Sequence, residues 1–343
     1  MASNNKKFAN PLQDKVILLT GGTGSFGQKF VELALRYNPQ VIRIYSRGEH
    51  RQLEMESKFA DNHLRFLIGD VRDSCRLSRA MYGVNIVVHA AALKHVPVAE
   101  YNPLEAIKTN IYGSANVIEA AIDNEVEKVI AISSDKAVHP VNLYGMAKGC
   151  MEKLMIQANV YSRRTEKVVA GDKILKVDRL PRFSSVRYGN VIGSQGSVIP
   201  LWLQQRKSGK ITVTHEEMTR FWITLEVGAQ FVIDCIGRMR GGEVFVPKLP
   251  SMRLVDLANA IAPDAKREFI GIRPGEKLHE ILITEEEAKH TKEFESYYVI
   301  EPEFPFWTEE PYEGGKPLPE GFRYDSQTNP CSMTLDYSSL TGT

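Results

Sequence analysis

Short apolar runs alternate with longer, helix-like segments through the first half of the chain. The runs predict five buried strands, at residues 16–19, 41–45, 64–68, 86–89 and 129–133. The segment from about Phe26 to Tyr37 has helical periodicity, and further helical segments separate the later runs. Continuous Val, Ile and Leu strands that alternate with helices are typical of a parallel sheet covered on both faces. The pattern therefore predicts an α/β fold built on a doubly wound parallel sheet.

The regular alternation weakens after about Gly189. Strand-like pieces at 211–214 and 243–246 are mixed there with helices and with turns rich in Pro and Gly. We interpret this part as a smaller C-terminal lobe that binds the substrate and is interleaved with the last strands of the sheet. The predicted boundaries are 12–190 for the sheet domain, 191–300 for the lobe and 301–343 for a tail that wraps the surface.

A glycine-rich turn with the spacing G-x-x-G-x-x-G follows the first predicted strand. Gly21 permits a tight turn, Gly24 lets the backbone approach a pyrophosphate, and Gly27 allows the helix to pack closely on the strand. The helix that follows presents unpaired N–H groups to the phosphates. Between a buried strand and a helix, this motif predicts a Rossmann-type dinucleotide site. The predicted contacts are Gly21, Thr23, Gly24, Ser25, Phe26 and Gly27.

The end of the second predicted strand indicates which dinucleotide binds. NAD sites usually place Asp or Glu here for the ribose 2′-hydroxyl, whereas this chain has Ser46 and Arg47. A hydroxyl and a guanidinium suit a 2′-phosphate, and Arg51 lies one turn further on, so we predict NADP. A solvated loop cation is the alternative interpretation of Arg47. Asp70, after the third strand, is either a ligand of the adenine amino group or a helix cap.

Candidate chemistry lies at the end of the fifth predicted strand. The run Ser-Ser-Asp-Lys at 133–136 ends it, where parallel strands line a ligand crevice, and Tyr144 and Lys148 then share one face of a helix. Alcohol oxidation needs a base, and a nearby ammonium lowers the high pKa of a phenol. A chance spacing and a surface ion pair are the alternatives, but the preceding glycine turn favours catalysis. The predicted catalytic residues are Asp135, Lys136, Tyr144 and Lys148.

Composition narrows the classes of function. The 343 residues include 43 Lys and Arg against 42 Asp and Glu, so charge gives no reason to expect a nucleic-acid or membrane partner. The chain has no run of 18 apolar residues, and its polar N-terminus lacks the apolar stretch of a secretory signal. The four cysteines have no metal-ligand spacing and are expected to be buried or semi-buried free thiols. We therefore expect a cytoplasmic protein without a metal site.

Several stretches together resemble a known family. The glycine turn, Tyr144, Lys148 and the chain length are similar to the extended short-chain dehydrogenase/reductases. Within that family, the likeness is most specific to the inverting UDP-N-acetylglucosamine 4,6-dehydratases and runs from about Lys15 to about Ile300. The stretches that carry it are GDVRD at 69–73, AAALKHVP at 90–97, SDKA at 134–137, NLYG at 142–145, RYGNV at 187–191, MTRFW at 218–222 and GIRPGEK at 271–277.

The resemblance implies conversion of UDP-N-acetylglucosamine, with inversion at C5, to a UDP-2-acetamido-2,6-dideoxy-4-keto-L-hexose for glycan biosynthesis. It implies that Tyr144 takes the 4-hydroxyl proton as hydride leaves C4 for NADP⁺, while Lys148 holds the nicotinamide ribose. Lys136 then serves as base at C5, and Asp135 protonates the departing 6-hydroxyl before hydride returns to C6. Electrostatics adds a difficulty, because an adjacent ammonium lowers the pKa of Asp135, which has to be protonated to act as an acid.

A diphosphate and a uracil base need cations, amides and a flat apolar slot. Candidates for the UDP moiety are therefore Arg187, Asn190, Arg220 and Arg273, together with the backbone of the loop 191–197. His95 has a structural alternative and no catalytic role, and Arg253 or Arg273 could equally be solvated or paired. The resemblance adds Val71, Ala90, Ala91 and Lys94 for the cofactor. The full predicted set for the substrate is Lys94, His95, Glu100, Arg187, Asn190, Val198, Arg220, Arg253, Arg273 and Glu276.

Two other functions stay open. A UDP-sugar 4-epimerase would use the same glycines, tyrosine and lysine but has no need for Asp135 and Lys136. A non-enzymatic NADP-sensing protein would need neither Tyr144 nor Lys148. The charged segment 161–181 predicts an exposed loop or hairpin that bears on assembly, for which we expect a homo-oligomer, either a dimer or a hexamer.

Overall fold

The computed structural model describes residues 10–162, 164–170, 173–179, 181–193, 198–304 and 312–331. The parallel strands of its central sheet are β1 (Val16–Thr20), β2 (Val41–Ser46), β3 (Leu64–Ile68), β4 (Ile86–His89), β5 (Lys128–Ile132), β8 (Arg182–Val186) and β12 (Val244–Pro247). Its antiparallel strands are β16 (Thr291–Glu293), β17 (Tyr297–Ile300) and β18 (Lys316–Pro317). Within the described ranges, the strand order is β18-β16-β17-β12-β8-β5-β4-β1-β2-β3. The predicted α/β fold with a parallel sheet is confirmed.

The helices divide between the two faces of this sheet. They are α1 (Ser25–Ala34), η1 (Leu35–Tyr37), α2 (Glu49–Phe59), α3 (Ser74–Met81), α4 (Val96–Tyr101), α5 (Pro103–Ile107), η2 (Lys108–Tyr112), α6 (Gly113–Asp123), η3 (Asp135–Ala137), α7 (Leu143–Ser162) and α9 (Leu225–Arg238). Successive residues of β1 point to opposite faces, as in any strand. Ile17 and Leu19 join an apolar cluster with α1 and α9, whereas Leu18 joins a second cluster with α3, α6 and α7. Burial on both faces explains the continuous apolar runs.

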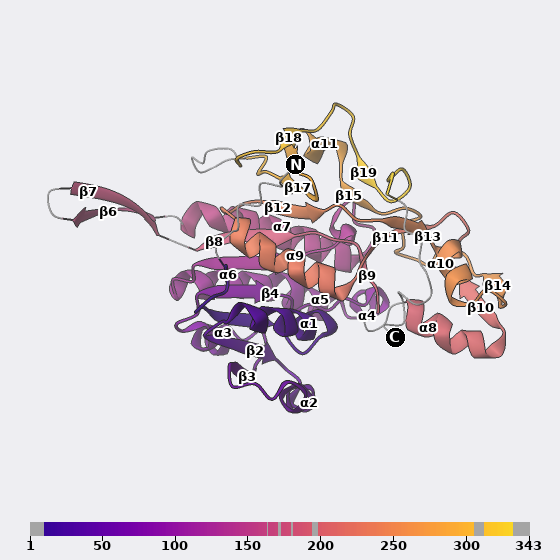
Figure 1. The fold of residues 1–343 in the computed structure, drawn as a ribbon, viewed down its shortest axis with the longest axis horizontal. Coiled ribbons are helices and arrows are strands. Elements are labelled where there is room, and N and C mark those ends of the chain that lie inside the picture. The colour runs from indigo at the N-terminus through magenta and orange to yellow at the C-terminus, as the bar shows by residue number, and fades with distance from the viewer. Residues whose placement is uncertain are drawn as a thin grey trace, which may run out of the picture.

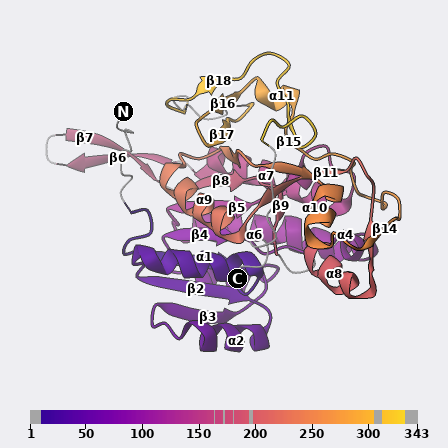
Figure 2. The same ribbon diagram turned by 45° about the vertical axis from the view of Figure 1, so that its right-hand side comes forward.

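The lobe is built from short strands and two helices. Its elements are β9 (Asn190–Val191), α8 (Val198–Gln205), η4 (Arg206–Ser208), β10 (Lys210–Val213), β11 (Thr219–Ile223), β13 (Ser251–Arg253), α10 (Leu254–Ile261) and β14 (Lys266–Phe269). Helices α8 and α10 lie close together in this lobe (Figure 2). The lobe encloses a separate apolar cluster that includes Trp202 and Trp222. Of the two strand-like pieces predicted beyond Gly189, one is β10 of the lobe. The other is β12, which pairs in parallel with β8 of the central sheet.

Two further segments complete the chain. The charged insertion contains β6 (Arg164–Ala170) and β7 (Lys173–Arg179), which pair antiparallel as a hairpin that projects from the body (Figure 1). In the tail, β19 (Tyr324–Asp325) pairs with β15 (Ile281–Ile283), which precedes α11 (Glu285–Ala288). The Tyr324 ring lies 4.8 Å from that of Phe221, so this part of the tail is packed into the interior. Residues 305–311 and 332–343 of the predicted tail lie outside the described ranges.

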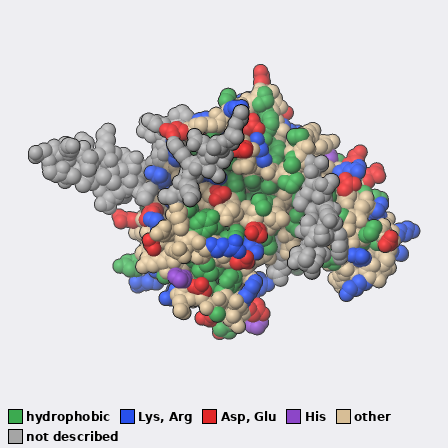
Figure 3. All heavy atoms as spheres, viewed as in Figure 1, with side chains coloured by type: hydrophobic (Ala, Val, Ile, Leu, Met, Phe, Trp, Pro, Cys, Tyr) green, Lys and Arg blue, Asp and Glu red, His purple; other side chains and the backbone are tan. Residues whose placement is uncertain are grey.

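The distribution of charged side chains and the exposure of the cysteines can be compared with what the composition predicted. On the face shown in Figure 3, acidic and basic side chains are interspersed rather than gathered by sign. The part of the chain that the structure describes contains no helix that is long and apolar enough to cross a membrane. All four cysteines are free, but Cys75 and Cys331 are exposed, so the expectation that the thiols are at least partly shielded is wrong for these two.

The contact between α1 and the turn before it is tight enough to test. A Cβ atom added at Gly27 would lie 2.2 Å from the carbonyl oxygen of Gly22, which is backbone and cannot swing aside. We expect Gly27→Ala to lower the free energy of unfolding by about 1–3 kcal/mol, as overpacking does. Gly228→Ala is the control, because its added Cβ would make an ordinary 3.5 Å contact with Ile223. Chemical denaturation measures both, and equal stabilities would contradict the tight contact.

Candidate functional site

A cavity of about 1400 Å³ lies where the sheet domain meets the lobe. Its walls come from the carboxyl ends of β1, β2, β4 and β5, from α7, and from β9, β11 and α8 of the lobe. In a doubly wound sheet, ligands bind outside the carboxyl ends of the strands, at the point where the strand order reverses. That reversal lies here between β1 and β4, because the chain runs outward to β3 on one side and to β12 on the other.

The glycine turn forms one end of the cavity. Gly21 has a φ of 68°, and a Cβ there would lie 2.9 Å from the backbone of Ala91, so only glycine fits without displacing the β4 end. No side chain caps the start of α1, where Gly24 is the first residue outside the helix. An uncapped helix start that faces a cavity suits an anionic pyrophosphate. All six residues predicted in this turn line the cavity.

Next to the turn, the end of β2 forms a cationic rim. Gln52 donates from Nε2 to the carbonyl and to the hydroxyl oxygen of Ser46, which holds the strand end in place. Arg47 is 56% exposed, and its guanidinium lies 4.0 Å from a carboxylate oxygen of Asp70. Burial works against ionisation of Asp70, but hydrogen bonds from Arg72 lower the pKa of its carboxyl. The residues predicted here, Ser46, Arg47, Arg51, Asp70 and Val71, all line the cavity.

Helix α7 places its two predicted catalytic side chains in the middle of the cavity. Its first turn is held from outside, since Asn142 Oδ1 accepts from the N–H of Gly145 and Glu100 Oε1 accepts from that of Leu143. Four residues after Tyr144, Lys148 donates from Nζ to the carbonyl oxygen of Ile132 at 2.6 Å. That contact ties the helix to the end of β5.

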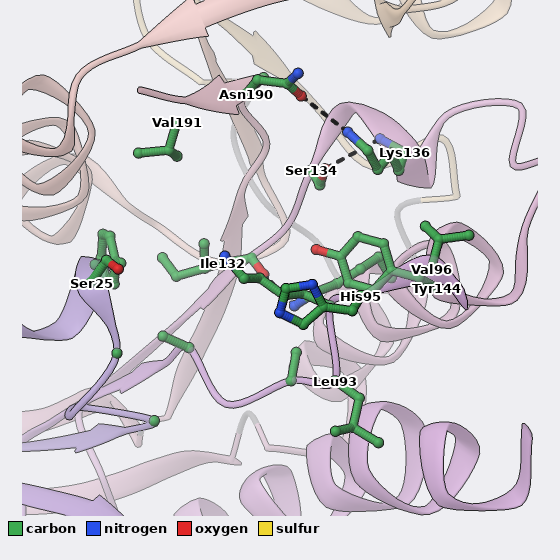
Figure 4. A pocket seen from close by; sticks show the side chains of 18 of the residues that line it. Ser25, Leu93, His95, Val96, Ile132, Ser134, Lys136, Tyr144, Asn190 and Val191 are labelled. Carbon is green, nitrogen blue, oxygen red and sulfur yellow. Dashed lines mark hydrogen bonds between the residues drawn. The ribbon is translucent and has the colours of Figure 1, made fainter. Parts of the chain in front are cut away.

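The side chain of Tyr144 points from α7 toward the strand end (Figure 4). Burial raises the pKa of the Tyr144 phenol, while the Lys136 ammonium and a hydrogen bond with Ser134 lower it. Burial also lowers the pKa of Lys148 to about 8. An isolated phenol is protonated, but the Tyr144 phenol lies close to the Lys136 ammonium, and this positive charge favours the phenolate.

The end of β5 is followed by an ion pair in which Asp135 is buried and Lys136 is partly exposed. Asp135 is fully buried, and its Oδ1 accepts hydrogen bonds from Lys136 Nζ at 3.0 Å and from Ser134 Oγ at 2.7 Å. Lys136 Nζ also donates to Asn190 Oδ1 of the lobe at 3.1 Å (Figure 4). Burial raises the pKa of Asp135, but the Lys136 charge and the Ser134 hydroxyl outweigh burial and lower it. The lowered pKa of Asp135 and the raised pKa of Lys136 favour the ionic form of the pair. This direction agrees with the sequence argument that an adjacent ammonium lowers the pKa of Asp135.

The structure brings most of the predicted substrate residues to the same cavity. From the segment after β4, the lining residues are Ala90, Ala91, Lys94 and His95. From the lobe and the loop after β14, the lining residues are Asn190, Val198, Arg220, Arg273 and Glu276. Residues 194–197 of the predicted nucleotide loop lie outside the described ranges.

Three predicted substrate residues lie elsewhere, and those assignments are corrected. Arg187 is buried on the far side of the cavity wall, where its guanidinium binds both carboxylate oxygens of Glu152 and of Glu287. Glu100 caps α7, as described above, and does not line the cavity. Arg253 is exposed and pairs with Asp256 three residues on. Each side chain is therefore engaged in structural contacts rather than directed at a ligand.

Sequence reasoning missed three residues of the site. Ser134 joins Asp135 and Tyr144, and its place at a strand end between two assigned residues was an available signal. Lys277 donates from Nζ to the carbonyl oxygen of Val138 at 2.8 Å. Glu280 lies at the same wall and forms a 2.9 Å ion pair with Lys277. No periodicity marks these last two, because they come from an irregular loop that is distant in sequence.

Comparisons with known proteins agree with this geometry. A family described as "Polysaccharide biosynthesis protein" matches residues 17–302. A UDP-N-acetylglucosamine 4,6-dehydratase (inverting) of Campylobacter jejuni is 49% identical, over 92% of this chain and 93% of its own length. A UDP-glucose 4-epimerase of Rickettsia rickettsii is 42% identical, over 84% of this chain and 83% of its own. The solved structure of Pen from Bacillus thuringiensis has a TM-score of 0.83 and 38% identity, covering 94% and 95% of the two chains.

The reassignment of Arg187 leads to a stability prediction. Arg187→Leu leaves the carboxylates of Glu152 and Glu287 without their shared cation, so we expect a loss of about 3–5 kcal/mol in the free energy of unfolding. Arg253→Leu is the matched control and removes only an exposed ion pair, with an expected loss below about 1 kcal/mol. Denaturant titration compares them. If Arg187→Leu kept full stability but bound the nucleotide more weakly, Arg187 would be a substrate-binding residue after all.

Proposed function

We propose that this chain, which belongs to the polysaccharide biosynthesis protein family, is a UDP-N-acetylglucosamine 4,6-dehydratase that inverts C5. The observation that carries the proposal is the pair of the buried Asp135 and the partly buried Lys136, 3.0 Å apart, in the same cavity as Tyr144. Removing water across C5 and C6 needs a base at C5 and an acid at O6. Exchange at C4 alone needs neither, since one phenol suffices as acid and base.

The residues around the glycine turn and the β2 end fit a dinucleotide, and we propose NADP. The turn and the start of α1 would hold the pyrophosphate, and Ser46, Arg47 and Arg51 would surround a 2′-phosphate. When bound, the cofactor supplies a hydride acceptor for C4 and returns that hydride to C6. Lys148, which is already held by the Ile132 carbonyl, lies one turn from Tyr144 and would meet the nicotinamide ribose.

The first proton transfer involves Tyr144. Burial raises the pKa of the Tyr144 phenol. The phenol therefore has to lose its proton before it can accept the proton of the 4-hydroxyl. The positive charge of Lys136 favours the phenolate, and so does a hydrogen bond with Ser134. The proton of the 4-hydroxyl then goes to the Tyr144 oxygen, and a ketone forms at C4, which acidifies the proton at C5.

The second step uses the ion pair in its neutral form. A single proton moved across the 3.0 Å contact converts the Lys136 ammonium and the Asp135 carboxylate into an amine and a carboxylic acid. A sugar that excludes water from this cavity favours the neutral pair, because two ions lose more solvation than two neutral groups. The amine then removes the C5 proton, and the acid protonates the departing 6-hydroxyl, which leaves as water. This resolves the difficulty that the sequence raised for Asp135.

The experiment that tests the function incubates the purified chain with NADP⁺ and UDP-N-acetylglucosamine in D₂O. We expect loss of water and deuterium at C5, seen by mass spectrometry and NMR. Lys136→Ala should slow water loss by about 10²–10⁴-fold while NADP stays bound, and Tyr144→Phe should block oxidation at C4 to a similar extent. A product that keeps its 6-hydroxyl with C4 inverted would instead establish the 4-epimerase, for which the Rickettsia relatives provide the precedent.

Cofactor preference has its own test. Arg47→Ala should weaken binding of NADP⁺ by about 10- to 100-fold, because a charge-assisted hydrogen bond to the 2′-phosphate is lost, and should leave NAD⁺ binding nearly unchanged. Isothermal titration calorimetry measures both affinities. Arg36→Ala, which removes a surface cation paired with Glu32, is the control for a general loss of charge. An equal loss of affinity for NADP⁺ and NAD⁺ would show that Arg47 does not bind the 2′-phosphate.

A further inference from the structure

The proposed reaction leaves one buried carboxylate of the cavity without a role. Glu280 is 2% exposed and lies in the loop that leads into β15. Its backbone is fixed on both sides, since its N–H donates to Ser326 Oγ at 2.9 Å and its carbonyl accepts from the N–H of Ser326 at 2.8 Å. A carboxylate held this rigidly away from water has to be compensated by neighbouring cations.

Three cations surround the Glu280 carboxylate. Lys277 Nζ lies 2.9 Å from Oε2, while Arg220 Nε and Lys136 Nζ lie 3.9 and 4.0 Å from Oε1. Lys277 and Arg220 are themselves fixed, because Lys277 donates to Val138 and Arg220 donates to the carbonyls of Thr219, Lys277 and Leu278. Their positions hold one carboxylate oxygen toward the proposed base.

Lys136 therefore faces charge from several elements. The titratable and charged groups around it are Asp135 on η3, Tyr144 on α7, Arg220 on β11, and Lys277 and Glu280 on the loop before β15. Burial works against the ammonium, but the carboxylates of Asp135 and Glu280 outweigh it and raise the pKa of Lys136. Asp135 gives up its negative charge whenever it is protonated for the elimination. Glu280 has no such proton-transfer task in the proposed reaction.

We infer that Glu280 is a positioning residue that directs the Lys136 amine and stabilises the ammonium that this amine becomes on taking the C5 proton. The inference rests on the proposed function. In the step concerned, the C5–H bond breaks and an N–H bond forms on Lys136. The freed electron pair forms the C5–C6 double bond as the C6–O bond breaks, and Asp135 supplies the proton that completes the water molecule.

The two carboxylates then have different parts in this step. The state after elimination, with a Lys136 ammonium and an Asp135 carboxylate, is the ionic form that the lowered pKa of Asp135 and the raised pKa of Lys136 favour. Glu280 lowers the energy of the ammonium as it forms, so the amine is a stronger base than it would be beside Asp135 alone. Loss of this charge makes Lys136 a weaker base, which deprotonates at lower pH but removes the C5 proton more slowly at saturation.

The test compares Glu280→Gln with Glu280→Asp in the full-length, NADP-loaded chain. Glutamine keeps the shape and removes the charge, whereas aspartate keeps the charge and shortens the reach. The first readout is the titration of Lys136 itself, from the pH dependence of its trace acetylation measured by mass spectrometry. We expect the midpoint to fall by about one pH unit in Glu280→Gln and to stay close to the original in Glu280→Asp. An unmoved midpoint in Glu280→Gln overturns the inference, whatever the activity.

The second readout is the pH profile of deuterium incorporation at C5 from D₂O with UDP-N-acetylglucosamine. In Glu280→Gln we expect the acid limb to move to lower pH and the plateau rate to fall by up to about tenfold, the limit set by a loss of one unit of basicity. A purely structural role for Glu280 would lower the plateau and leave the limb in place, and that result also overturns the inference. Failure of the original chain to incorporate deuterium would contradict the proposed function, while the acetylation midpoint would still decide whether Glu280 controls the charge of Lys136.

Discussion

The site depends on keeping two opposite charges together at the buried end of β5. Removal of Asp135 and Lys136 from water costs several kcal/mol per ion unless each is compensated by its partner and by further hydrogen bonds. Ser134 supplies such a bond from the same strand end, and Asn190 supplies another from the lobe. Because Asn190 comes from a distant part of the chain, this second contact forms only when the lobe is folded against the sheet.

The sheet and the lobe contribute different parts of the proposed chemistry. The strand ends of the sheet carry the groups that handle protons and the turn that suits a pyrophosphate, all on rigid, buried elements. The lobe closes the cavity and brings Arg220 and Asn190 to it. In the proposed reaction, groups at the strand ends would act on the protons at C4 and C5, while Asn190 of the lobe accepts a hydrogen bond from Lys136. A relative named as a dehydratase and one named as an epimerase match 92% and 84% of this chain.

The sequence predicted the location of a side chain correctly where the residue's position along a helix or strand decides which way that side chain points. Tyr144 and Lys148 share a face of α7 and the glycine turn follows β1, so the predicted positions agree with the cavity. It failed where direction depends on packing between elements. Arg187 and Asn190 lie three residues apart in one motif, yet Asn190 faces the cavity and Arg187 is buried against Glu152. Glu280 and Lys277 were not found, because only folding brings their loop to Lys136.

The sequence alone determined the α/β architecture, the order of its first five strands and helices, and the residues at the strand ends. Those features follow from local periodicity and from the conformational needs of glycine, which act over a few neighbouring residues. The tertiary structure decided which charges meet. It paired Arg187 with Glu152 and Glu287, brought Glu280 within 4.0 Å of Lys136, and so set the ionic state of the proposed base. The physical reason is that electrostatic energy depends on distance in space and on exclusion of water, and neither can be read from separation along a chain.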